Sequence, residues 1–109
     1  MLTLVTICVS AGILLTVLAL PLVWERVPPN WFYGFRVPAT LRDRRLWYAV
    51  NRYAGQRLLR VGLLTTAGAL GLSCVPGITA DGYGLGVLIL TGGAMSITVV
   101  QSFRYLHAL

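Results

Sequence analysis

Three apolar runs, uncharged apart from Arg60, divide this chain: residues 2–24, about 58–78 and about 83–103. About twenty predominantly apolar residues are what a helix needs to cross a hydrocarbon core of roughly 30 Å. The first run would rise about 34 Å as a helix. The pattern therefore predicts an all-α integral membrane protein with three transmembrane helices, in a single domain covering residues 1–109.

A polar loop, residues 25–57, separates the first two runs, and its first part is predicted to lie at the membrane interface. Pro28-Pro29 cannot continue a helix, so the first helix must end before this point. Aromatic and basic side chains favour the headgroup region of a bilayer. The residues expected at the lipid interface are Trp24, Trp31, Phe32, Tyr33, Phe35, Arg44 and Arg45.

The second part of the loop has the pattern of an amphipathic helix over about residues 41–55. Thr40 is its predicted N-cap, and Asp43 three residues later resembles a capping box. At 100° per residue, Trp47 and Val50 share an apolar face that opposes a face rich in arginine. Such a helix typically lies in the headgroup plane. We therefore expect an interfacial helix that ends or kinks at Gly55.

The last two runs are joined by the polar segment Thr79-Ala80-Asp81-Gly82, which predicts a tight turn and an antiparallel helical hairpin. Small residues four positions apart, such as Ala67/Gly71 and Gly92/Ser96, allow helices to approach closely. Two interpretations remain open at this point. The glycines either pack the hairpin against itself, or they form a face for the transmembrane helix of a partner.

Charge gives the orientation of the chain. The net charge is +6, all nine basic residues are arginine, and eight of them lie in residues 26–60. Cytoplasmic loops carry an excess of basic residues. The sequence therefore predicts the cytoplasmic (inner) membrane of a bacterium, with the N-terminus outside and both the loop and the C-terminus in the cytoplasm. No nucleic-acid-reading module is present, so the arginines do not predict a nucleic-acid partner.

Catalysis, transport and metal binding find little support. Apart from Arg60 at a boundary, the spans hold no ionisable group of the kind that pumps and ion-coupled transporters need. There is no Ser/His/Asp set, carboxylate pair or phosphate-binding loop, so we expect no enzyme, no catalytic residue and no cofactor. Cys8, Cys74 and His107 lack metal-site spacing. A Cys8–Cys74 disulfide is conceivable, but two free thiols are favoured.

The order and spacing of several loop residues resemble a known family signature. They are Pro28, Pro29, Asn30, Gly34, Phe35, Arg36, Pro38, Thr40, Leu41, Trp47, Asn51, Arg52 and Gly55. The pattern resembles the SdpI family of bacterial membrane proteins, in a short form without the additional N-terminal spans. Val37, where that family usually has threonine, and the basic segment 42–45 depart from it.

The resemblance implies an immunity or resistance protein that binds a toxic peptide or a regulator through its loop. The partner-binding residues expected on this basis are Pro29, Asn30, Gly34, Arg36, Thr40, Trp47, Arg52 and Gly55. Anionic lipid headgroups are a second expected partner of the basic loop. The alternative function is an accessory subunit of a larger membrane complex, and self-association is a further option.

Overall fold

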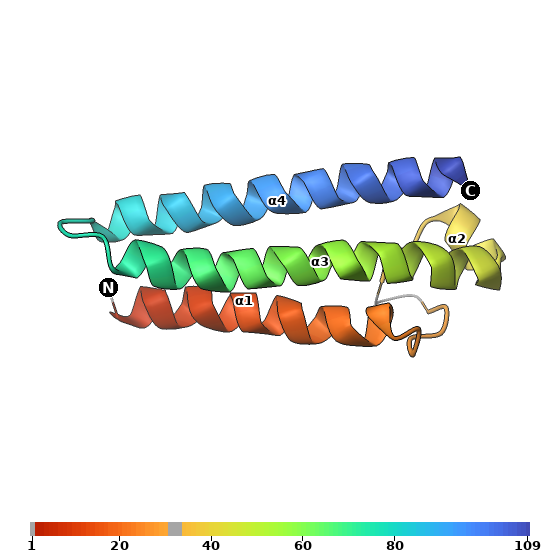
Figure 1. Cartoon of the computed structure of the whole chain (residues 1–109), viewed down its shortest axis with the longest axis horizontal. Helices are drawn as coiled ribbons and strands as arrows, with labels where there is room; N and C mark the ends of the chain where they lie inside the picture. The colour runs from red at the N-terminus through yellow and green to blue at the C-terminus, as the bar shows by residue number, and fades with distance from the viewer. Residues whose placement is uncertain (1, 31–33) are drawn as a thin grey trace.

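The computed structural model describes residues 2–30 and 34–109, and all of its regular elements there are helices. They are α1 (Leu2–Val23), α2 (Pro38–Arg42), α3 (Arg44–Ser73) and α4 (Ala80–Ala108). The three long helices lie side by side with α3 in the middle, and each runs antiparallel to the next (Figure 1). The loop and α2 fold at one end, together with the C-terminus, while the N-terminus and the α3–α4 connection lie at the other.

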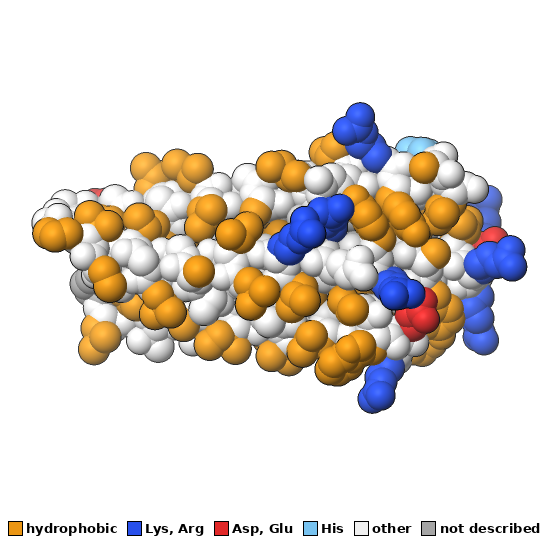
Figure 2. Space-filling model, viewed as in Figure 1, with side chains coloured by type: hydrophobic (Ala, Val, Ile, Leu, Met, Phe, Trp, Pro, Cys, Tyr) orange, Lys and Arg blue, Asp and Glu red, His pale blue; other side chains and the backbone are white. Residues whose placement is uncertain are grey.

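Two of the long helices, α1 and α4, are long and apolar enough to cross a membrane. Their outward faces carry exposed leucine, isoleucine and valine side chains along most of their length. The third, α3, does not meet the same criterion, because Arg57 and Arg60 lie within it. The molecule measures 51 × 23 × 18 Å, so its long axis exceeds the roughly 30 Å of a hydrocarbon core. Most arginine side chains on the visible face lie toward the loop end, and one group lies nearer the middle (Figure 2).

Helices α1 and α3 approach closely through a reciprocal glycine–threonine contact. A Cβ added to Gly12 would come within 2.7 Å of the Thr66 backbone nitrogen. A Cβ added to Gly62 would come within 2.6 Å of the Thr16 backbone nitrogen. Each threonine hydroxyl donates to the glycine carbonyl one turn earlier in its own helix, at 2.9 Å, so neither is left unsatisfied. Close backbone approach of this kind is how small residues join membrane helices.

The α3–α4 hairpin is held by polar contacts inside an apolar cluster. The fully buried Tyr83 donates its hydroxyl to the Ala69 carbonyl at 2.9 Å, and Thr65 and Thr91 share a hydrogen bond of 2.8 Å. Gly68 lies against Leu90 of the opposite helix. These contacts agree with glycine packing within the hairpin. Gly92 and Gly93, in contrast, have open space beside them.

The turn between α3 and α4 differs from the prediction. Helix α3 ends at Ser73, and α4 begins at Ala80, so the segment predicted as a tight turn opens a helix instead. Thr79 is its N-cap and accepts the Gly82 amide at 3.0 Å. The chain reverses earlier, where Pro76 cannot continue α3 and Gly77 has a positive φ of 75°.

Cys8 is half-buried, Cys74 is exposed, and both are free thiols.

The separate interfacial helix over 41–55 is not observed. Residues 44–73 form one helix without a break at Gly55. The side chains of Trp47 and Val50 are fully buried within the protein. This apolar face is therefore covered by the chain itself and not by the headgroup region of a bilayer. Gly55 does not kink the chain but admits the end of α1, because an added Cβ would lie 3.1 Å from the Val23 nitrogen.

Candidate partner-binding loop

The loop leaves α1 through a tight left-handed turn. Glu25 has a φ of 57°, and the Arg26 amide donates back to the Pro21 carbonyl at 3.0 Å. Bonds of this kind satisfy the last carbonyls of a helix. They also turn the chain, so that Val27 lies beside Trp47 in the first turns of α3.

Trp47 anchors the returning chain. Its side chain is 0% exposed, and its indole Nε1 donates to the Val27 carbonyl at 2.7 Å. A buried indole normally needs a partner for its N–H. Here that partner is a backbone group twenty residues earlier, which fixes the loop to the first third of α3.

Asn51 holds the second half of the loop, one turn further along α3. Its Oδ1 accepts the Phe35 amide, and its Nδ2 donates to the Phe35 carbonyl at 3.3 Å and to the Trp47 carbonyl at 2.9 Å. The neighbouring Gly34 has a φ of 108°, and an added Cβ would lie 2.6 Å from Asn51 Oδ1. Glycine is therefore required here both by conformation and by space.

Thr40 closes the loop from within α2. It is fully buried; its Oγ1 accepts the Val37 amide at 3.0 Å and lies 3.1 Å from the Phe35 carbonyl. It is thus not the N-cap that the sequence predicted, because α2 begins two residues earlier, at Pro38. Asp43 is itself the N-cap of α3, and its carboxylate accepts the Arg45 amide at 2.9 Å.

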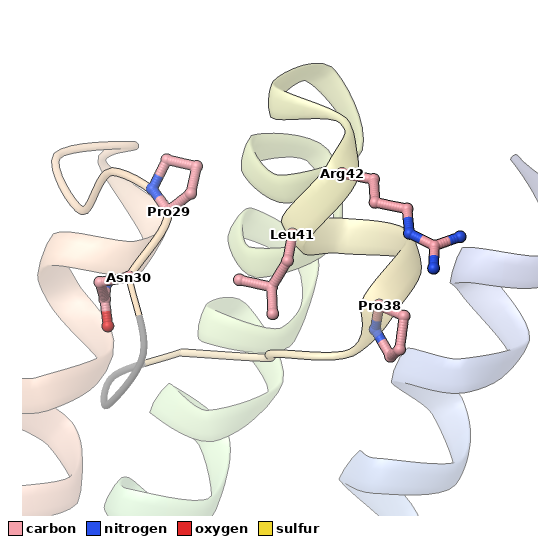
Figure 3. Close-up of a pocket in the computed structure, with 5 residues that line it drawn as sticks. All are labelled: Pro29, Asn30, Pro38, Leu41 and Arg42. Carbon is pink, nitrogen blue, oxygen red and sulfur yellow. The ribbon is translucent and has the colours of Figure 1, made fainter.

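This loop contains an open pocket of about 500 Å³. It is lined by Pro29, Asn30, Pro38, Leu41 and Arg42 (Figure 3). The first two come from the segment after α1 and the other three from α2, so the pocket lies between the two halves of the loop. Leu41 points into the gap between them. The lining combines proline and leucine carbons with one amide and one guanidinium group.

The residues predicted to bind a partner divide into two groups. Thr40, Trp47 and Gly55 are buried, and Gly34 is half-buried against α3, so these four position the loop. Arg36 and Arg52 are exposed, and Pro29 and Asn30 line the pocket. Pro38, Leu41 and Arg42 also line the pocket, although the sequence did not predict them as partner-binding residues. Their signal was the Pro-x-Thr-Leu run, which places Leu41 beside the buried Thr40.

The residues predicted at the lipid interface also fall into different places. Trp24 is 59% exposed at the end of α1, with the Arg26 guanidinium 5.7 Å from its ring. Phe35 packs edge-on against Phe103 of α4 at 5.0 Å, so its role is internal. Trp31, Phe32 and Tyr33 lie outside the described residues. Arg44 and Arg45 are exposed at the start of α3.

Arg52 reaches a second, polar pocket of about 320 Å³ on another side of α3. Glu25, Tyr53, Gln56 and Tyr105 share its lining, and the two tyrosine rings stack at 4.3 Å. Within residues 2–30 and 34–109, no group of three or more His, Cys, Asp or Glu side chains is placed to hold a metal ion. The linings of the two pockets present apolar surface, guanidinium groups and aromatic rings.

Comparison with known proteins places this loop in a family. No curated protein and no solved structure matches the chain. The model of the SdpI/YfhL protein family matches residues 26–102, which include the whole folded loop, all of α3 and most of α4. Because this match covers more than half of the sequence, the chain belongs to the SdpI/YfhL protein family.

Proposed function

We propose that α3 crosses the membrane together with α1 and α4, giving three spans in the cytoplasmic membrane of a bacterium. The support is that α3 lies between two apolar helices of spanning length. The arginines of the loop, of the first three turns of α3 and of the C-terminal end of α4 lie toward one end of the bundle. By the positive-inside bias this end faces the cytoplasm, and the N-terminus and the α3–α4 turn face outward.

The function proposed for the chain is to bind a peptide or protein partner in the pocket of the loop, in an immunity or resistance role. One observation carries this proposal. The loop is fixed by Trp47, Asn51 and Thr40, and it still leaves an open pocket beside them. Fixing a loop costs about 1–2 kcal/mol of backbone entropy per residue. A loop that served only to set the membrane topology would not require a fixed conformation.

The lining of the pocket indicates the kind of partner. Pro29, Pro38 and Leu41 offer an apolar surface, and Asn30 and Arg42 add polar groups at its sides. A peptide with an apolar side chain next to a carboxylate or a row of carbonyls would match this lining, since arginine favours carboxylate partners. Binding alone accounts for such a role, and we propose no catalysis.

The proposal is tested by challenging cells with a panel of membrane-active peptides, with and without the gene. We expect survival against at least one peptide to depend on the gene. Arg42→Glu should abolish that protection, because it reverses the charge of the pocket. Arg45→Glu makes the same change in charge outside the pocket and should preserve protection. Equal survival across the panel with and without the gene would contradict the proposal.

An accessory subunit of a larger membrane complex is the second candidate. The observation that favours it is the open space beside Gly92 and Gly93 on α4, next to exposed Leu88 and Ile89. Close approach of a partner helix needs such a surface. Native electrophoresis after extraction in mild detergent distinguishes the candidates. Migration at a large mass, combined with equal survival in the challenge, would favour the subunit.

A further inference from the structure

A further groove lies between α3 and α4, away from the loop pocket and from the polar pocket at Arg52. It is a groove of about 190 Å³ lined by Arg57, Arg60, Val61, Ala94, Ile97, Thr98 and Gln101. In Figure 2 a group of arginine side chains lies near the middle of the molecule, set apart from those at the loop end. The groove therefore combines two cations with an apolar floor.

The register between helices gives the depth of this groove. Gly55 packs against the backbone of Val23, the last residue of α1. At 1.5 Å per residue, Arg57 lies about 3 Å and Arg60 about 8 Å further along α3, toward the middle of α1. If α1 spans the bilayer, the Cα atoms of both arginines lie at or below the boundary between headgroups and hydrocarbon. Arg44 and Arg45 lie about 15 Å beyond Gly55 in the other direction.

An arginine at this depth needs an anion, because charge is costly in hydrocarbon. Among the described residues, no carboxylate lines the groove. Asp81 is at the far end of α4, and Asp43 caps the distant start of α3. Glu25 lines the neighbouring pocket with Arg52, one step closer to the cytoplasm. The anion therefore has to come from outside the protein.

The surroundings of the two arginines fit a headgroup. The Arg57 guanidinium lies 5.0 Å from the ring of Tyr53, one turn nearer the loop, so this side chain reaches toward the interface. Tyr53 stacks on Tyr105 of α4, one turn beyond Gln101. Tyrosine rings favour the headgroup level of a bilayer. Below them, the exposed Ile97 and Val100 offer an apolar surface to acyl chains.

We infer that the Arg57–Arg60–Gln101 groove binds the phosphate of an anionic phospholipid from the cytoplasmic leaflet. The two guanidinium groups would hold the phosphate oxygens, and Gln101 would donate a further hydrogen bond. A lipid is favoured over free phosphate because the floor of the groove and the adjoining surface of α4 are apolar. The inference rests on the membrane position proposed above, and it assigns the lipid site to different arginines from those expected from the sequence.

Native mass spectrometry of the full chain, released from an equal mixture of phosphatidylglycerol and phosphatidylcholine, tests this inference. We expect retained lipid to favour phosphatidylglycerol about thirtyfold, since each of the two arginines contributes about 1 kcal/mol near an anionic surface and about 1.4 kcal/mol corresponds to tenfold. Arg57→Gln/Arg60→Gln should remove the preference. Arg44→Gln/Arg45→Gln, with the same loss of charge at the start of α3, should keep most of it. Arg57→Lys/Arg60→Lys should retain part of it.

Three outcomes would overturn the inference. They are no preference in the unsubstituted chain, an equal loss in both glutamine pairs, and full competition by millimolar inorganic phosphate, which would assign the groove to a free anion. Size-exclusion chromatography of each variant confirms that the fold is kept. Because lipid retention is read without any peptide partner, its failure leaves the survival assay as a separate test of the proposed function.

Discussion

Gly62→Leu is expected to separate α1 from α3 and to destabilise the bundle by about 3 kcal/mol, at the upper end of the range for overpacking. An added Cβ would lie 2.6 Å from the Thr16 nitrogen and 3.0 Å from the Gly12 carbonyl oxygen. These are backbone atoms, so the clash cannot be relieved by a change of rotamer. The two helix axes must move apart, which also loosens the contact at Gly12.

The measurement is the midpoint of denaturation in a titration from mild detergent into sodium dodecyl sulfate, followed by helical circular dichroism. Gly71→Leu is the matched control, because it adds the same side chain to the same helix where nothing lies within 4 Å. We expect the control to shift stability by less than about 0.5 kcal/mol. Equal midpoints for Gly62→Leu and Gly71→Leu would show that α1 does not pack on α3 as described.

Trp47→Ala is expected to release the loop while the long helices remain paired. The substitution empties a fully buried site and leaves the Val27 carbonyl without its indole donor. Truncation of a buried tryptophan costs about 3–5 kcal/mol. Most of this loss falls on the segment that Trp47 fixes, so residues 25–43 should open far more often.

Trypsin digestion in lipid nanodiscs measures this opening, since Arg36 and Arg42 lie within the loop. Cleavage there should accelerate at least about tenfold, because proteolysis follows the population of the open form. Trp24→Ala is the control, for Trp24 is mostly exposed at the end of α1. Cleavage of Trp47→Ala at the rate of the unsubstituted chain would argue that the loop is not anchored by the indole.

The helical class and the apolar character of α1 and α4 could be read from the sequence because they depend on composition over long runs. The continuity of α3 could not. Its first turns have an amphipathic pattern that is equally typical of an interfacial helix. What decides between the two is whether the protein or the membrane covers Trp47, and this depends on where the loop folds.

The loop site was predictable in part. The glycine, asparagine and tryptophan positions could be singled out by their spacing. They were associated with partner binding, whereas in the structure they hold the loop in place. Trp47 and Asn51 face inward and hold the backbone of Val27 and Phe35, which leaves Leu41 and Arg42 at the surface. A side chain that fixes a loop and one that contacts a partner look alike in a sequence, because only burial separates them. The Gly12–Gly62 contact was missed because its residues lie fifty positions apart.

The proposed topology has α3 crossing the bilayer, with the loop and the α3–α4 turn on opposite sides. Labelling with a membrane-impermeant maleimide tests it most directly. Cys74 is an exposed natural reporter beside the turn once Cys8→Ser removes the other thiol. Arg42→Cys in a chain that also carries Cys8→Ser and Cys74→Ser reports on the loop. We expect Cys74 to be labelled in intact spheroplasts, and the thiol introduced at position 42 to be labelled only in inverted vesicles. Labelling of both positions from the same side would contradict it.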